Sequence, residues 1–205
     1  MVAIVEEKKK SKANKKSQKK IPEYLIYEIL DNKKIYYKDY KKVLSGEIPP
    51  EAVMGSSDLQ AWIISIIMEF LFKNLPKKYK VLSNEVGYFY TSSRSKKWLN
   101  LDIAVINREK LKKPKGTYLK VPPEVVIEVD TKAELSELGS EYYLLKTERL
   151  LDSGIKKVIW IFTDVKKIQI AQKGEPWIIV DFDYEFEIID NIKINLAKLL
   201  QEDDL

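Results

Sequence analysis

The sequence of 205 residues contains no cysteine and no histidine. These absences exclude disulfide bonds, thiol nucleophiles, zinc sites of the usual kind, and the Ser-His and Cys-His catalytic pairs. Long apolar runs are also missing: no stretch approaches the roughly 20 residues of a membrane-spanning helix, and the N-terminus lacks the apolar segment of a signal peptide. We therefore expect a cytoplasmic protein without a membrane partner, whose chemistry uses carboxylates, lysines, hydroxyl groups or a hard cation.

Positive charge is concentrated at the N-terminus. Residues 1–20 hold eight lysines and two glutamates, an excess larger than the net charge of +5 of the whole sequence. The remaining residues are therefore nearly neutral, so net charge is no evidence that they bind nucleic acid. The low apolar content of residues 1–20 predicts a disordered tail, whose lysines would either attract phosphate groups or only increase solubility.

Residues 21–205 predict a single α/β domain, because their length and apolar content suit one hydrophobic core. Alternation of period two predicts strands at residues 80–90 and 98–107. A run of Val and Ile predicts a strand buried on both faces at residues 125–129, and a further strand is expected at residues 156–164. Helical periodicity predicts helices at residues 58–75 and 136–154, the first beginning at a Ser57 or Asp58 cap and buried on more than one side. Shorter strands are expected at residues 21–30, 33–36, 166–172, 176–182 and 184–190. The predicted architecture is a mixed sheet flanked by helices, with added strands near both termini.

Two carboxylates lie within apolar strands. Glu128 lies near the end of VVIEV, and Asp102 lies in the middle of LNLDIAVIN. Burial of an unpaired ion costs several kcal/mol, and two ionised acids at comparable positions on adjacent strands would repel each other. Magnesium would resolve this conflict, since it takes carboxylate, water and phosphate oxygens as ligands. A neighbouring lysine would satisfy a carboxylate equally well, so the spacing leaves a metal site and a structural ion pair both open.

Two lysines are candidates for completing a site that cleaves phosphodiesters, where a cation stabilises the charge that develops on the phosphate. Lys132 follows the strand that carries Glu128, and Lys146 lies in the middle of the next predicted helix. The alternative for Lys146 is a surface lysine that extends its ammonium group into water. The sequence does not decide between these two lysines.

Seven segments of the sequence carry a family resemblance. They are IPEYLIYEIL, IYYKDYKKVL, VMGSSDLQAWIISIIMEFL, NEVGYFY, LDIAVIN, PPEVVIEVDTKAEL and KTERLLDSGIKKVIWIF. On these segments the chain resembles the Uma (Uma-two) family of restriction endonucleases, within the PD-(D/E)xK nuclease superfamily. The resemblance covers about residues 21–190 and implies a restriction-endonuclease-like core of helix, three strands, helix and strand.

The resemblance also implies roles for particular residues. Asp102 and Glu128 match the motif acids that hold Mg²⁺ or Mn²⁺, together with the backbone carbonyl of Val129. Lys146 matches the place to which members of the family often move the motif lysine.

The motif is imperfect in this chain. Leu101 stands where a proline would precede Asp102, and Asp130 stands where the lysine of E-x-K would be. Lys132 therefore remains a rival to Lys146. Asp130 is a candidate third ligand or an orienting group, and Glu85 would join only through a water molecule.

Two functions follow as alternatives. The first is a magnesium-dependent DNA endonuclease, expected to act as a homodimer and helped in DNA binding by its Lys-rich tail and by the basic turn at residues 92–97. The second is a catalytically inactive nuclease-fold protein that serves as a nucleic-acid or protein interaction module. The broken E-x-K motif favours the second function, which predicts acids paired with lysines and no bound metal.

Overall fold

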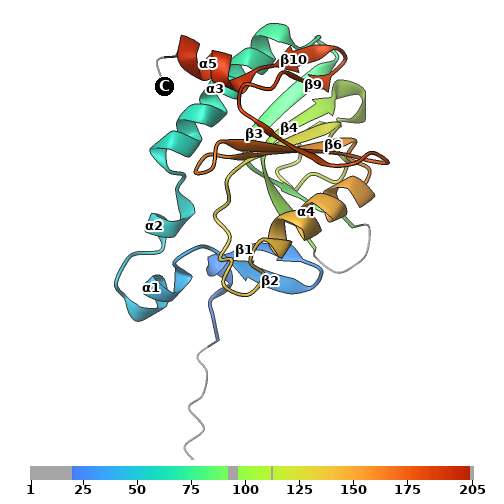
Figure 1. Ribbon diagram of the computed structural model, residues 1–205. Helices are drawn as coiled ribbons and strands as arrows, with labels where there is room; N and C mark the ends of the chain where they lie inside the picture. Colours follow the sequence, from blue (N-terminus) through green and yellow to red (C-terminus); the bar gives the residue numbers. More distant parts are fainter. Residues whose placement is uncertain (1–19, 92–96, 112, 204–205) are drawn as a thin grey trace, which may run out of the picture.

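The computed structural model describes residues 20–91, 97–111 and 113–203 (Figure 1). Apart from Lys20, the predicted tail lies outside these residues, as does most of the basic turn. The helices are α1 (Tyr40–Ser45), α2 (Glu51–Met54), α3 (Asp58–Asn74), α4 (Glu141–Asp152) and α5 (Leu196–Glu202). The strands are β1 (Ile26–Leu30), β2 (Lys33–Tyr36), β3 (Tyr79–Tyr88), β4 (Leu99–Asn107), β5 (Val125–Val129), β6 (Lys157–Phe162), β7 (Lys167–Gln172), β8 (Ile178–Asp181), β9 (Phe186–Ile189) and β10 (Ile192–Ile194).

The predicted mixed sheet is confirmed. Six strands form it in the order β3-β4-β5-β6-β7-β8, while β1–β2 and β9–β10 form separate two-stranded hairpins. Only the β5–β6 pair is parallel within the described sheet, and Glu128 lies opposite Trp160 in its register. Helix α4 connects these two strands, as a parallel pair requires a crossover.

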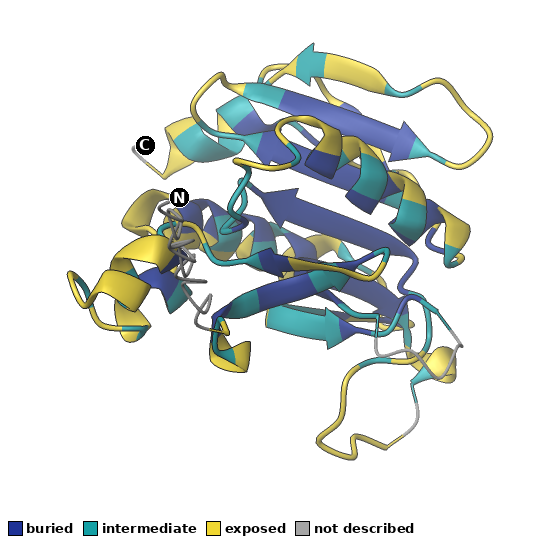
Figure 2. Ribbon diagram, turned by 90° about the horizontal axis from the view of Figure 1, so that it is seen from below, coloured by how far each residue is buried: buried dark blue, intermediate teal, exposed yellow. Residues whose placement is uncertain are grey.

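The sheet lies between two layers. Helix α3, α5 and the β9–β10 hairpin contribute to the core on one face, whereas α4 and the β1–β2 hairpin contribute to the core on the other. Strand β5 alternates between the faces, with Ile127 and Val129 packed on the α3 side and Val126 on the α4 side. Glu128 therefore points toward α4, because alternate residues of a strand share a face. Figure 2 shows the central strands as buried.

Helix α3 begins where the sequence predicts, since the Ser57 hydroxyl accepts a hydrogen bond from the Gln60 N–H at 3.1 Å. The expectation that α3 is buried on more than one side is wrong. Its contacts are with β3, β4, β5 and α5, and they leave Trp62 48% exposed and Phe72 63% exposed. None of the helices in the described ranges is long and apolar enough to cross a membrane.

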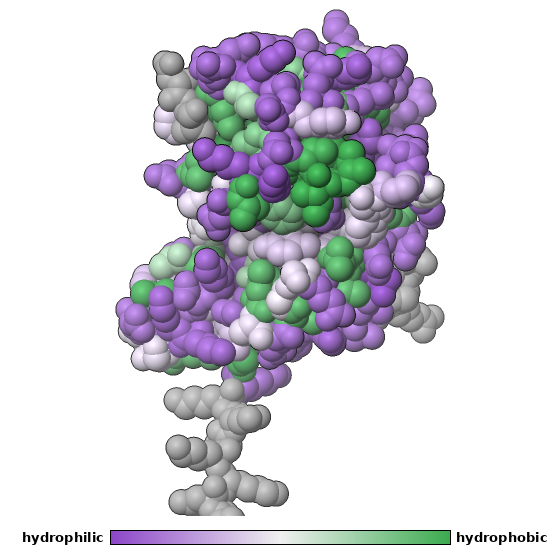
Figure 3. Space-filling view, in the orientation of Figure 1, coloured by the Kyte–Doolittle hydropathy of each residue, from purple (hydrophilic) through white to green (hydrophobic). Residues whose placement is uncertain are grey.

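Strand β8 forms an edge of the main sheet and pairs with β7. It exposes two large apolar side chains, Ile178 and Ile179, the second of which is 66% exposed. Figure 3 shows hydrophobic residues gathered at the level of the main sheet, on a face that is otherwise mostly hydrophilic. Exposed apolar groups on an edge strand are a surface suited to pairing with another chain.

Gly87 provides a test of the packing at the other edge of the sheet. A Cβ atom added to Gly87 would lie 2.7 Å from the Tyr118 ring, and the adjacent Leu119 N–H donates to the Gly87 carbonyl at 2.8 Å. Since that hydrogen bond limits how far the ring can retreat, we expect Gly87→Ala to lower the free energy of unfolding by about 1–3 kcal/mol. Urea denaturation followed by tryptophan fluorescence measures this change.

The matched control is Gly55→Ala, because no atom lies within 4 Å of a Cβ added there. We expect this change to stay within about 0.5 kcal/mol. Equal stabilities for the two variants would contradict the close contact at Gly87.

Candidate functional site

Asp102 lies where strands β4 and β5 separate. The pairing between these strands ends at Ile103 and Ile127. Beyond this point Asp102 replaces the missing backbone partner, since its Oδ2 atom accepts the Val129 N–H at 2.8 Å. The Asp102 side chain is buried, so the hydrogen bond is made in a region with little water.

A β-bulge in β3 lies opposite Asp102. Ser83 pairs with Ile103 and Val86 pairs with Leu101, so two residues of β3, Asn84 and Glu85, occupy the space opposite one residue of β4. Both have positive φ angles, 77° and 51°. Bulges of this kind change the direction in which a side chain points, and they occur frequently next to active sites.

The bulge directs Glu85 toward Lys132. The two side chains form an ion pair, and the Lys132 ammonium also donates to the Met54 carbonyl at 3.3 Å. Lys132 is 11% exposed and Glu85 is 26% exposed, so this pair lies at the border between the protein interior and water. Both residues are close enough to Asp102 to influence its pKa, Lys132 lowering it and Glu85 raising it.

Lys146 lies at the centre of the site. Its Nζ atom is 3.2 Å from Glu28 Oε2 and 3.3 Å from Glu128 Oε2, and it donates to the Asn100 carbonyl at 2.8 Å. The side chain has no exposed surface. The alternative of a surface lysine is therefore excluded, because Lys146 lies on the face of α4 that packs on the sheet.

Three aromatic rings close the space around the Lys146 ammonium. The ring centres of Tyr27, Tyr142 and Trp160 lie 5.8, 5.9 and 5.4 Å from Nζ. Aromatic faces attract a cation and at the same time keep water away from it. The positive charge of Lys146 is thus directed toward its carboxylate partners.

Sequence reasoning missed two residues of this site, Glu28 and Gln60. Glu28 is fully buried, and it accepts hydrogen bonds from the Tyr142 hydroxyl at 2.6 Å and from the Asn100 N–H at 3.2 Å. The sequence feature that pointed to Glu128, an acid between apolar residues of a strand, is also present at Glu28. The Gln60 amide donates to the Val129 carbonyl at 2.6 Å, and only the position of this glutamine on the buried face of α3 could have revealed it.

Two other predicted site residues have partners outside the group of acids. The Val129 carbonyl accepts the hydrogen bond from Gln60. Asp130 turns toward the end of β6, where it accepts hydrogen bonds from the Thr163 N–H at 2.9 Å and from the Thr163 hydroxyl at 2.6 Å. The structure therefore brings together Asp102, Glu128 and Lys146, and it directs Asp130 elsewhere.

The site holds more buried acids than buried cations. Burial raises the pKa of Glu128 well above its usual value; Lys146 opposes this rise, and Asp102 and Glu28 add to it. Burial also raises the pKa of Asp102, against the opposing effects of the Val129 N–H and Lys146. For Lys146, burial lowers the pKa, but Glu128 and Glu28 outweigh this effect and keep the lysine charged. Two acids therefore form ion pairs with one buried ammonium group, a third, Asp102, is buried nearby, and the excess negative charge requires protons or a cation.

The arrangement of oxygen atoms fits a hard divalent cation. Among the described side chains, Glu128 Oε1 is buried and has no hydrogen-bond partner. The described residues contain no group of three or more metal-binding side chains at ligand spacing. Magnesium does not need such a group, because it commonly binds one or two carboxylates and keeps several water molecules. Asp102 and Glu128 are the two carboxylates of this site that would bind such a cation.

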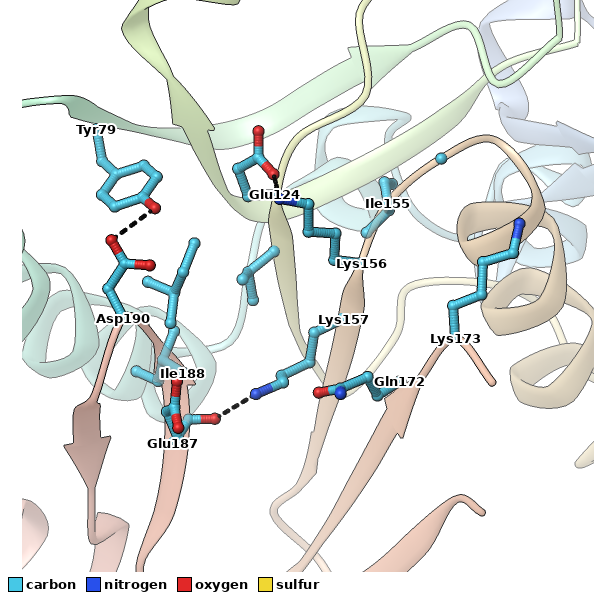
Figure 4. Close-up of a pocket in the computed structure, with 13 residues that line it drawn as sticks. Tyr79, Glu124, Ile155, Lys156, Lys157, Gln172, Lys173, Glu187, Ile188 and Asp190 are labelled. Atoms are coloured by element: carbon cyan, nitrogen blue, oxygen red, sulfur yellow. Dashed lines mark hydrogen bonds and ion pairs between the residues drawn. The ribbon is translucent and has the colours of Figure 1, made fainter. Parts of the chain in front are cut away.

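A separate cavity of about 440 Å³ lies where strands β5 and β6 begin, at the end of β5 opposite to Glu128 (Figure 4). Two of its lysines already have partners. Lys156 lies 2.8 Å from Glu124 Oε2, and Lys157 donates to the Glu187 carbonyl at 2.7 Å. This cavity is therefore distinct from the site around Lys146.

Replacing Asp102 by asparagine should stabilise the metal-free protein. Burial raises the pKa of Asp102 in the folded state. The folded protein therefore favours the protonated acid, and it loses free energy of unfolding as pH rises through that pKa and Asp102 ionises. The asparagine amide would keep an oxygen for the Val129 N–H without the charge. We expect Asp102→Asn to raise the free energy of unfolding by about 1 kcal/mol at pH 7, and the gain to disappear at acid pH.

Urea denaturation at several pH values in the presence of a chelator measures this difference. Asp183→Asn, at an exposed position, is the control and should change the free energy of unfolding by less than about 0.5 kcal/mol. An Asp102→Asn variant less stable than the wild type at pH 7 would contradict the expectation.

Comparison with known proteins supports the fold. No family model and no curated protein matches the chain. Among solved structures, the chain is similar to one described as "a putative nuclease belonging to DUF820 from Anabaena variabilis ATCC 29413", with a TM-score of 0.59 and 12% sequence identity. The match covers 85% of this chain and 89% of that chain. The chain therefore has a nuclease-like α/β fold.

Proposed function

We propose that the protein is a magnesium-dependent endonuclease that hydrolyses phosphodiester bonds of DNA. The observation that carries this proposal is the buried, unpartnered oxygen of Glu128, on the strand adjacent to that of Asp102. Glu124 Oε2 is also buried without a hydrogen bond, but it lies 2.8 Å from the Lys156 ammonium. The ion pair of Glu128 uses its Oε2 atom, which leaves Oε1 available as a metal ligand. The nuclease described in the similar solved structure is consistent with this reading.

In this proposal Asp102 and Glu128 hold the cation through their carboxylates. The Val129 carbonyl would be a further ligand once its hydrogen bond from the Gln60 amide is broken. Magnesium, when bound, supplies an activated water molecule and offsets negative charge on the phosphate. Asp102 is fixed for this task by the Val129 N–H, and Glu128 by Lys146. The aromatic rings around Lys146 exclude water from the side of the site next to α4.

The two lysines have different access to a substrate. Lys146 has no exposed surface, so its ammonium acts on Glu128 and offsets charge from within the protein. Lys132 is partly exposed, and its partner Glu85 lies on the β3 bulge. Lys132 is thus the lysine that can contact a phosphate oxygen directly.

The proposal includes a homodimer, because cleavage of both DNA strands is usually carried out by two sites related by a twofold axis. The exposed edge strand β8, with Ile178 and Ile179, is a surface that could pair with the same strand of a second copy.

One observation favours the alternative, an inactive interaction module. Glu128 and Glu85 both form ion pairs with lysines, as that function predicts. The two functions differ in what happens at the free oxygen of Glu128. Metal binding there supports the endonuclease, and absence of binding supports the module.

The first test is magnesium or manganese binding by calorimetry, followed by nicking of supercoiled plasmid. We expect the wild type to bind and nick. Glu128→Ala should abolish detectable binding and lower the nicking rate by at least about 100-fold, since it removes a ligand. Glu124→Gln is the control, because Glu124 is another buried acid that lies just before β5, beside Lys110 and Lys156. Nicking that survives in Glu128→Ala would exclude this site as the nuclease centre.

The second test separates the lysines. Lys132→Ala should lower the nicking rate about 10- to 100-fold and leave magnesium affinity nearly unchanged, because Lys132 contacts the phosphate and not the metal. Plasmid nicking and calorimetry measure the two quantities, and exposed Lys77→Ala serves as the control. An unchanged nicking rate in Lys132→Ala would remove this lysine from the mechanism.

A further inference from the structure

Glu28 reaches the site from outside the main sheet. It lies in β1, in the N-terminal hairpin, and has no exposed surface. Its carboxylate meets groups from two other elements: the Asn100 N–H of β4, and the Tyr142 hydroxyl and Lys146 ammonium of α4. Tyr142 and Lys146 are four residues apart and therefore lie on one face of the helix.

The hairpin is fixed in the position that this contact requires. The register of β1 and β2 shifts between Ile26 and Glu28, so that both Tyr27 and Glu28 are buried. The hairpin also bonds to the start of β4, since the Ile29 N–H donates to the Trp98 carbonyl at 2.9 Å and the Asn100 amide donates to the Tyr27 carbonyl at 2.7 Å. A shifted register beside a functional group is a known way to redirect a side chain.

Lys146 is shared almost equally between two acids, with Nζ at 3.2 Å from Glu28 and 3.3 Å from Glu128. We propose that Glu28 is a positioning residue, which holds the Lys146 ammonium between two carboxylates and so leaves one oxygen of Glu128 free for a divalent cation. This inference rests on the proposed function for its metal, but the position of Lys146 is independent of it.

The physical reason is competition for Glu128. Without the charge of Glu28, the Lys146 ammonium has Glu128 as its nearest remaining carboxylate, and their attraction is strong in a region with little water. The cation would then have to displace Lys146. Magnesium affinity should therefore fall when Glu28 loses its charge, even though Glu28 is not a metal ligand.

The test is magnesium titration of the full chain carrying Glu28→Gln. We expect affinity to fall at least about tenfold, and to stay within twofold of the wild type in Glu124→Gln, which also lacks one buried carboxylate charge. Equal affinities of the wild type and Glu28→Gln would overturn the inference.

A double-mutant cycle distinguishes positioning from a general loss of negative charge. In a Lys146→Met background, where no ammonium competes for Glu128, Glu28→Gln should change magnesium affinity less than twofold. A further tenfold loss would show that Glu28 acts by its charge alone. If Glu28→Gln alone does not fold, the two Lys146→Met proteins still compare magnesium affinity with and without the Glu28 charge, because replacing both members of a buried ion pair by uncharged side chains is better tolerated than breaking it.

A readout without metal separates this inference from the proposed function. In ¹⁵N-labelled protein, the buried Lys146 ammonium should exchange its hydrogens slowly, and Glu28→Gln should speed that exchange at least about tenfold while Glu124→Gln leaves it unchanged. If the wild type binds no magnesium, the proposed function fails and the exchange rate alone decides the role of Glu28. Unchanged exchange in Glu28→Gln would refute that role.

Discussion

The buried ammonium group of Lys146 is the feature on which the rest of the site depends. It lies within 3.3 Å of two carboxylate oxygens, and it donates to the Asn100 carbonyl of β4. Through these contacts a single charge joins the N-terminal hairpin, the sheet and α4. Removing one member of such a group leaves an unpaired buried charge, which is costly. Electrostatic attraction to Lys146 therefore helps to hold the hairpin, the sheet and the helix together.

The departures from regular sheet geometry lie around this charge. The β4–β5 ladder stops before Asp102, a bulge in β3 lies opposite Asp102, and the register of β1 shifts next to Glu28. The end of the β4–β5 ladder leaves the Val129 N–H for Asp102, and the two register shifts lie at Glu85 and beside Glu28. The site residues therefore lie where regular strand pairing is interrupted. The regular parts of the strands supply the apolar core on both faces of the sheet.

The sequence predicted the fold better than it predicted the site. Alternation and capping residues placed the main strands and α3, because these signals are local. The positions of Asp102 and Glu128 were visible as acids in apolar strands, but the burial of Lys146 depends on which face of α4 meets the sheet. Glu28 carried the same local signal as Glu128, but its place in the site depends on Tyr142, 114 residues away, and the contact of Gln60 with Val129 spans 69 residues. Such contacts follow from tertiary packing, which spacing along the chain does not encode.

The separation of Glu28 from α4 also has a consequence for protein synthesis. A ribosome releases the hairpin long before it releases Tyr142 and Lys146, so the nascent chain carries Glu28 for more than a hundred residues without its partners. Until α4 emerges, Glu28 has neither the ion pair with Lys146 nor the hydrogen bond from the Tyr142 hydroxyl. The assembled group of charges is thus a late product of folding, and no N-terminal fragment that ends before α4 possesses it.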